Sequence, residues 1–217
     1  DFFAVLDQAV VHSHPKPKVL VLNYPGNPTA EVVDLAFYQE VVAYAKKHDI
    51  ILLSDLAYSE IYFDEDNPPP SILQVEGAKD IAVEFTSLSK TFSMPGWRMG
   101  FAVGNEKLIG ALTRIKSYLD YGAFTPIQVA AAAALDSPEE IIRDIRAVYK
   151  ERRDVLIDVF LRAGWNVPLP PATMFAWARI PAPFADMKSL EFSELLLKEA
   201  DIAVSPGIGF GEYGDDY

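Results

Sequence analysis

The chain has 217 residues, half of them hydrophobic, and its 19 Lys and Arg against 31 Asp and Glu give a formal net charge of −12. This size and apolar content exclude wholesale disorder, and the absence of cysteine excludes a disulfide scaffold, a cysteine-ligated zinc site and a thiol nucleophile. The acidic balance argues against a general binder of nucleic acid or anionic membranes, since phosphate groups attract basic surfaces. No stretch approaches a membrane span and the first residues lack the order of a signal peptide, so we expect a cytoplasmic protein.

The first half of the chain alternates apolar runs with one amphipathic segment. Lys18–Asn23, Ile50–Ser54 and Ile81–Phe85 are short runs rich in Val, Ile and Leu, which is typical of buried strands. Between the first two runs, Leu35–His48 carries apolar residues at helical spacing and ends in basic residues that suit a helix C-terminus. Strand, helix and strand with short joints indicate a parallel sheet covered by helices.

The second half is predicted to contain more helix than strand. Residues 107–119 and 127–135 read as helices, and a longer helical stripe begins at Ser137-Pro138 and stops at Gly164. A helix of that length can link two domains. The remaining predicted elements are strands at Trp97–Val103, Met174–Ile180 and Ile202–Val204 and a helix at Ser189–Ala200. We read Met174–Trp177 as strand core, with pocket lining as the alternative.

Polar residues gather where the predicted buried strands end. In open α/β sheets, ligands bind outside the carboxyl ends of the strands, so these residues are expected to meet in one crevice. The candidate site residues are Asn27, Asp55, Tyr58, Ser87, Ser89, Lys90 and Arg98.

A phosphorylated pyridine aldehyde suits each of these side chains. Lysine forms an imine with an aldehyde, and an aspartate beside a pyridine nitrogen keeps that nitrogen protonated. Hydroxyls and an arginine fork suit a phosphate, while a phenol and an amide can bond the phenolic oxygen of the ring. The three scattered histidines and the lack of cysteine predict no metal site.

Three segments carry a specific resemblance to a known family. NYPGNPTA (Asn23–Ala30), SDLAYSEIYFD (Ser54–Asp64) and SLSKTFSMPGWRMG (Ser87–Gly100) are similar to the signature blocks of fold-type I, class I/II pyridoxal-phosphate-dependent aminotransferases, in the same order. The likeness continues through PPATMFAW (Pro170–Trp177) and VSPGIGFG (Val204–Gly211). Within the family, the chain most resembles bacterial glutamate–pyruvate (alanine) aminotransferases.

The resemblance implies a role for each candidate residue, with pyridoxal 5′-phosphate as the cofactor. Lys90 would be the Schiff-base lysine and the catalytic acid and base. Asp55 would pair with the pyridinium nitrogen, and Tyr58 and Asn27 would bond the phenolic oxygen. Ser87, Ser89 and Arg98 would hold the phosphate. Ala30 stands where many members have glycine.

The resemblance also implies an architecture. The fold class would be α/β, a three-layer α/β/α arrangement with a mostly parallel sheet, joined to part of a smaller α+β domain. Residues 1–150 would be the cofactor-binding large domain without its N-terminal part, and residues 151–217 a partial small domain. Residues Tyr121–Thr125 match a loop that approaches the partner subunit's site in the family, which implies a homodimer.

Two features of the family have no counterpart in this sequence. Nothing matches the upstream aromatic that stacks on the cofactor ring, and no arginine matches the one that binds the substrate carboxylate. We therefore expect the chain to be a fragment, poorly active by itself, of a protein of roughly 400 residues.

The predicted reaction is transfer of an amino group between an amino acid and a 2-oxo acid, with alanine/pyruvate and glutamate/2-oxoglutarate as the preferred pair. Aspartate, LL-diaminopimelate or aromatic substrates, or β-elimination at the same site, remain alternatives. A non-enzymatic alternative is a regulator domain that binds pyridoxal phosphate without turnover.

Overall fold

The computed structural model describes all of residues 1–217, and four strands and seven α-helices make up its regular structure. The strands are β1 (Val19–Asn23), β2 (Ile51–Asp55), β3 (Ala82–Ser87) and β4 (Gly100–Gly104). The helices are α1 (Phe2–His12), α2 (Leu35–His48), α3 (Leu88–Thr91), α4 (Glu106–Leu119), α5 (Thr125–Leu135), α6 (Glu139–Arg162) and α7 (Ser189–Ala200). The predicted elements from residue 18 to residue 164 are confirmed, with small shifts of their ends.

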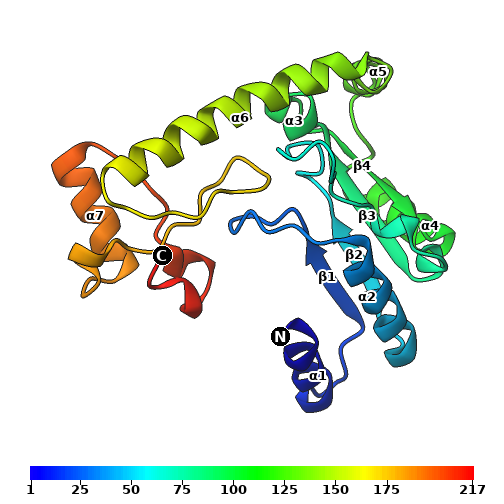
Figure 1. Cartoon of the computed structure of the whole chain (residues 1–217). Helices are drawn as coiled ribbons and strands as arrows, with labels where there is room; N and C mark the ends of the chain where they lie inside the picture. The colour runs from blue at the N-terminus through cyan, green and yellow to red at the C-terminus, as the bar shows by residue number, and fades with distance from the viewer.

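The strands form one sheet in the order β1-β2-β3-β4 (Figure 1). β1, β2 and β3 run parallel, in a register that aligns Asn23 with Asp55 and Asp55 with Phe85. β4 runs antiparallel to β3, because the chain turns back at the end of β3 and Gly100 pairs with Ser87. The predicted α/β class with a mostly parallel sheet is therefore confirmed. The sequence pattern did not predict that the last strand, β4, runs antiparallel.

The core of this α/β part lies between α2 and one face of the sheet. Tyr38, Val41 and Ala45 of α2 are fully buried against Leu52 and other strand residues. Their spacing of three and four residues places them on one side of the helix, and burial of each large apolar side chain stabilises the fold by roughly 1.5–3 kcal/mol. This packing thus fixes the strands, and the residues at their carboxyl ends, relative to one another.

Helix α1 was not predicted as an element. The Asp1 side chain accepts a hydrogen bond from the backbone N–H of Phe3, which caps the start of the helix. The rings of Phe2 and Phe3 then pack against Phe37 of α2, at centroid distances of 5.0 and 5.9 Å. The aromatic contacts extend the core beyond α2.

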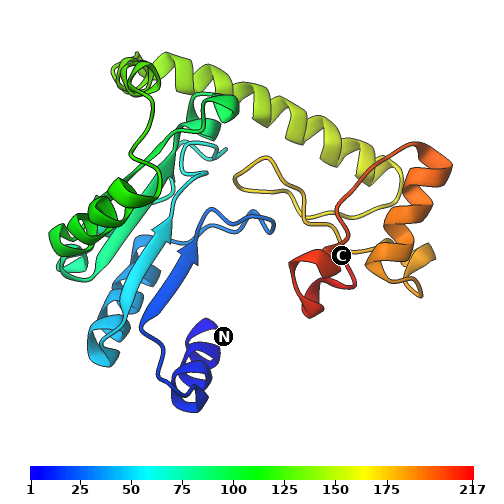
Figure 2. The same ribbon diagram turned by 180° about the vertical axis from the view of Figure 1, so that it is seen from behind.

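Helix α6 connects the sheet-containing part to the C-terminal part. Figures 1 and 2 show it running from α5, beside the sheet, to the vicinity of α7. Its 24 residues span about 36 Å at 1.5 Å per residue, and it passes through residue 150 without interruption. None of the helices combines the length and the hydropathy that a membrane crossing requires.

The strands predicted at Met174–Ile180 and Ile202–Val204 are wrong. Both segments are irregular, because a strand needs a run of hydrogen bonds to a neighbouring strand and these segments make only isolated ones. Ile180, for example, donates a single bond to the carbonyl of Asp216 at 2.9 Å. The predicted strand over Trp97–Val103 begins only at Gly100, because Trp97 lies in a 3-10 turn.

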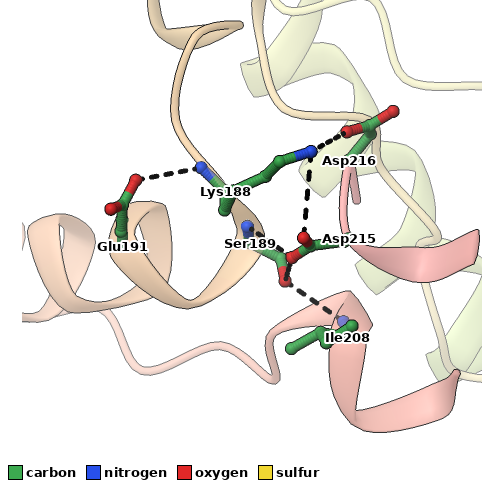
Figure 3. Close-up of polar contacts among 6 residues, drawn as sticks. All are labelled: Lys188, Ser189, Glu191, Ile208, Asp215 and Asp216. Carbon is green, nitrogen blue, oxygen red and sulfur yellow. Dashed lines mark hydrogen bonds and ion pairs between the residues drawn. The ribbon is translucent and has the colours of Figure 1, made fainter. Parts of the chain in front are cut away.

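A buried serine fixes α7 to the last residues of the chain (Figure 3). The Ser189 hydroxyl donates to the Asp215 carboxylate at 3.0 Å and accepts the Ile208 backbone N–H at 3.1 Å. Beside it, Lys188 contacts Asp216 at 3.2 Å, and this hydrogen bond raises the pKa of Lys188. The C-terminal turns are therefore held by side-chain contacts and isolated backbone hydrogen bonds rather than by a sheet.

Candidate active site

The carboxyl ends of the three parallel strands bring the predicted polar residues to one edge of the sheet. β1 ends at Asn23, β2 at Asp55 and β3 at Ser87. Figure 1 shows this edge facing the C-terminal part of the chain, across from the loop that follows α6. The region at the carboxyl ends of the strands, where the sequence predicts a crevice, therefore includes residues of both halves, since Tyr58 contacts Phe175.

Tyr58 and Asn27 meet in this crevice. The Asn27 amide donates to the Tyr58 hydroxyl at 3.5 Å, and only 7% of Tyr58 is exposed. Burial raises the pKa of Tyr58, the negative charge of Asp55 raises it further, and the hydrogen bond from Asn27 opposes both effects. The phenol therefore keeps its proton at neutral pH and is available as a hydrogen-bond donor.

Asn23 joins Asn27 to Asp55, a role that the sequence analysis missed. Its side-chain oxygen accepts the Asn27 backbone N–H at 2.8 Å, and its amide donates to the Asp55 carbonyl at 3.2 Å. The available signal was a polar residue at the last position of a buried strand. Asn23 thus orients two of the predicted site residues.

Lys90 lies on the short helix α3, which Ser87 starts. The Ser87 hydroxyl accepts the Ser89 backbone N–H at 3.1 Å and so caps the helix. The Lys90 ammonium lies 5.8 Å from the centre of the Tyr58 ring. The amine, the phenol and the amide of Asn27 therefore share one region of the crevice.

Asp55 and Arg98 have local partners. One carboxylate oxygen of Asp55 accepts the Ala57 backbone N–H at 3.1 Å, which fixes the turn after β2. Arg98 has a φ of 53° in the left-handed region and is exposed, and its guanidinium donates to the Pro95 carbonyl at 2.9 Å. The hydrogen bond of Arg98 thus goes to Pro95 rather than to Ser87 or Ser89.

The Pro170–Trp177 segment reaches the crevice from the C-terminal half. The Phe175 ring packs edge-on against Tyr58, with centroids 5.3 Å apart. This contact favours the pocket-lining interpretation of the segment over the strand-core one. Phe175 lies within Met174–Trp177, the segment for which pocket lining was the alternative expectation.

Two arginines hold the loop that follows Tyr58. Arg146 of α6 stacks over the Tyr62 ring at 3.7 Å and donates to the Glu60 carbonyl at 3.0 Å. Arg153 stacks over the Phe63 ring at 4.3 Å. Helix α6 therefore supports the site although it carries none of the predicted site residues.

These side chains form a donor set that fits a pyridoxal phosphate molecule. An amine, a carboxylate, and a phenol paired with an amide lie at the carboxyl ends of adjacent parallel strands. Ser87 and Ser89 at the capped start of α3 add two hydroxyls, which suit a phosphate. No part of this set conflicts with the cofactor that the sequence predicts.

Comparison with known proteins assigns the chain to a family. The profile of the family described as aminotransferase class I and II matches residues 3–215, so the chain belongs to that family. AatC of Rhizobium meliloti (strain 1021), named as an aminotransferase without a stated substrate, is 69% identical over all of this chain and 53% of its own length. The glutamate-pyruvate aminotransferase AlaC of Escherichia coli (strain K12) is 55% identical over all of this chain and 52% of its own length.

More distant relatives and solved structures agree. The LL-diaminopimelate aminotransferase of Natranaerobius thermophilus is 48% identical over 93% of this chain and 51% of its own length. The substrate-bound structure of BacF from Bacillus subtilis superimposes with a TM-score of 0.88 at 42% identity, covering 93% of this chain and 50% of that one. The chain therefore spans about half the length of the curated relatives it matches.

Proposed function

We propose that the protein to which this chain belongs is a pyridoxal-phosphate-dependent transaminase. The observation that carries the proposal is the meeting of the Asn27–Tyr58 pair with Lys90, beside Asp55, at the ends of parallel strands. In this proposal Asp55 faces the pyridine nitrogen, and Tyr58 and Asn27 bond the phenolic oxygen. The phosphate is held by Ser87, Ser89 and Arg98, the last of which would exchange its bond to Pro95 for the phosphate.

The chain's own residues would bind, orient and transfer a proton. When bound, pyridoxal phosphate supplies an aldehyde that takes up the amino group and a ring that accepts electron density from the substrate Cα. The Lys90 amine, freed by the incoming amino acid, would remove the proton from the substrate Cα and deliver it to C4′, the former aldehyde carbon of the cofactor. The Tyr58 phenol, kept protonated by burial and by Asp55, would donate a hydrogen bond throughout.

Lys90 provides the direct test of the site. In the full gene product, borohydride treatment with pyridoxal phosphate is expected to leave a pyridoxyl group on the peptide that contains Lys90. Lys90→Ala is expected to lose this label and the visible absorbance of the bound cofactor, whereas Lys47→Ala, a change at an exposed lysine of α2, should keep both. A label that persists on Lys90→Ala protein would remove Lys90 from the proposed role.

The preferred substrate pair is alanine/pyruvate with glutamate/2-oxoglutarate, which the similarity to AlaC supports. LL-diaminopimelate is the second candidate, because a relative at 48% identity carries that name. Assays of the full gene product with each donor distinguish the two, together with aspartate and aromatic donors. Release of ammonia without transfer of an amino group would indicate a β-lyase. Binding of the cofactor without turnover of any substrate would indicate a regulator.

We also propose that the protein is a cytoplasmic homodimer with residues 1–150 and 151–217 in two domains. Exposed apolar side chains around the end of α4 and the start of α5 support the dimer: Ile115, Tyr118, Leu119, Tyr121, Phe124 and Val129. They include two residues of the Tyr121–Thr125 loop that the resemblance assigns to the partner's site. Light scattering after size-exclusion chromatography tests the dimer, and Leu119→Asp is expected to yield a monomer.

A further inference from the structure

Thr173 has a backbone conformation that its side chain disfavours. Its φ is 67°, in the left-handed region, and only 2% of the residue is exposed. A β-branched side chain rarely adopts this region, since its Cβ substituents crowd the backbone. Such a conformation persists only where the surrounding structure imposes it, and it occurs frequently at functional sites.

Two hydrogen bonds of Thr173 hold this conformation, and both join it to residues that lie near Tyr58. The Thr173 backbone N–H donates to the Ile61 carbonyl at 2.6 Å, which ties the residue to the loop after Tyr58. The Thr173 hydroxyl accepts the backbone N–H of Phe175 at 3.2 Å, which closes a tight side-chain turn. Thr173 therefore helps to anchor its segment, together with the Phe63–Pro171 backbone bond, and its hydroxyl sets the backbone direction at Phe175.

The Phe175 ring packs against the Tyr58 ring. The two rings meet at an interplanar angle of 69°, an edge-on geometry that aromatic pairs prefer. Tyr58 has Lys90 near its ring and Asn27 at its hydroxyl, so a shift of Phe175 would move the phenol relative to both. The contacts form a continuous path from Thr173 through Phe175 to Tyr58.

We propose that Thr173 is a positioning residue, whose hydroxyl holds Phe175 against Tyr58 and so fixes the phenol in the crevice. The consequence for catalysis rests on the proposed function of Tyr58, whereas the positioning itself does not. Serine supplies the same hydroxyl without the extra methyl group and should replace Thr173. Glycine tolerates the left-handed conformation but lacks the hydroxyl, so it should not.

The test follows the Tyr58 ring directly by fluorine NMR of the full gene product labelled with 3-fluorotyrosine. The chain has 10 tyrosines, and the Tyr58 resonance is the one that disappears in Tyr58→Phe. Without cofactor, Thr173→Gly and Phe175→Leu should shift this resonance in the same direction, while Thr173→Ser should leave it in place. Phe184→Leu is the control, because Phe184 packs on Phe192, away from Tyr58.

Kinetics provide the second measurement. With the cofactor bound, Thr173→Gly should lower kcat roughly 10- to 100-fold with a smaller change in KM, because the misplaced group acts on the chemical step. Thr173→Ser should keep kcat close to that of the original protein. An unmoved Tyr58 resonance in Thr173→Gly overturns the proposal, and Thr173→Ala, which also lacks the hydroxyl, decides if Thr173→Gly does not fold. If no amino acid is turned over at all, the proposed function fails, and the cofactor-free resonance still decides the role of Thr173.

Discussion

Arg146 is predicted to stabilise the fold far more than Arg143, an exposed arginine of the same helix. Only 7% of Arg146 is exposed, and its guanidinium contacts the Glu60 carbonyl at 3.0 Å, the Glu60 carboxylate at 3.3 Å and the Tyr62 ring at 3.7 Å. Arg146→Ala removes these contacts together and leaves the Glu60 carbonyl without its partner. The substitution therefore removes the contacts of Arg146 that join α6 to the loop after Tyr58.

The cost of Arg146→Ala can be estimated from these contacts. A hydrogen bond from a charged group contributes about 1.5–3 kcal/mol and a cation–π contact roughly 0.5–2 kcal/mol. The ion pair with Glu60 adds little, since the Glu60 side chain is 38% exposed and screened by water. We expect the free energy of unfolding to fall by about 3 kcal/mol, which corresponds to a loss of roughly 6–12 °C in Tm.

Denaturant unfolding of the full gene product, followed by circular dichroism, measures this difference. The control is Arg143→Ala on the same helix, where an exposed pair with Glu140 at 3.3 Å should contribute less than about 0.5 kcal/mol. Arg146→Lys should recover only part of the loss, because an ammonium lacks the planar fork that stacks and donates together. Equal unfolding free energies for Arg146→Ala and Arg143→Ala would refute the role assigned to the buried contacts.

Three further predictions concern other polar groups of the fold. Asn23→Ala should weaken pyridoxal phosphate binding about tenfold or more, since Asn23 orients Asn27 and Asp55, whereas Asn67→Ala, which removes an exposed bond to Asp64, should leave titrated affinity unchanged. Ser189→Ala should lower the unfolding free energy by about 1–3 kcal/mol by leaving the Ile208 N–H unpaired, while Ser193→Ala should change it by less than about 0.5 kcal/mol; equal losses would contradict this. Burial raises the pKa of Glu84 above 4.5, so native Glu84 holds its proton to a higher pH than the unfolded chain and the fold loses stability as pH rises through that range. The unfolding free energy of Glu84→Gln relative to the original protein should therefore increase from pH 4.5 toward neutral pH, and a difference independent of pH would be inconsistent with the buried carboxylate.

Most elements of the N-terminal two thirds could be predicted because their signals are local. The apolar run at β2 and the helical spacing of α2 specify one strand and one helix from neighbouring residues alone. Where no partner strand was available, the same signals misled. Met174–Ile180 has the composition of a strand, yet it stays irregular because no adjacent strand pairs with its backbone.

The residue types of the candidate site were also readable from the chain, since Asn27, Asp55, Tyr58 and Lys90 follow predicted strands at their carboxyl ends. The residues that orient them were not. Asn23 acts through bonds to Asn27 and Asp55, which is 32 residues further along the chain. Such a bond has no periodic pattern, so the polar side chain of Asn23 at the end of its strand does not by itself indicate which residues it contacts.

By itself the sequence determined an α/β fold, the order of its first strands and helices, and the chemical groups that gather at one edge of the sheet. Hydrophobic periodicity and the direction of parallel strands suffice for these, because both are properties of short segments. Only the tertiary structure decided that β4 runs antiparallel, that Arg146 fastens α6 to the loop after Tyr58, and that Thr173 directs Phe175 onto the Tyr58 ring. Each of these depends on atoms far apart in the chain meeting at a few ångströms, and that proximity exists only once the chain has folded.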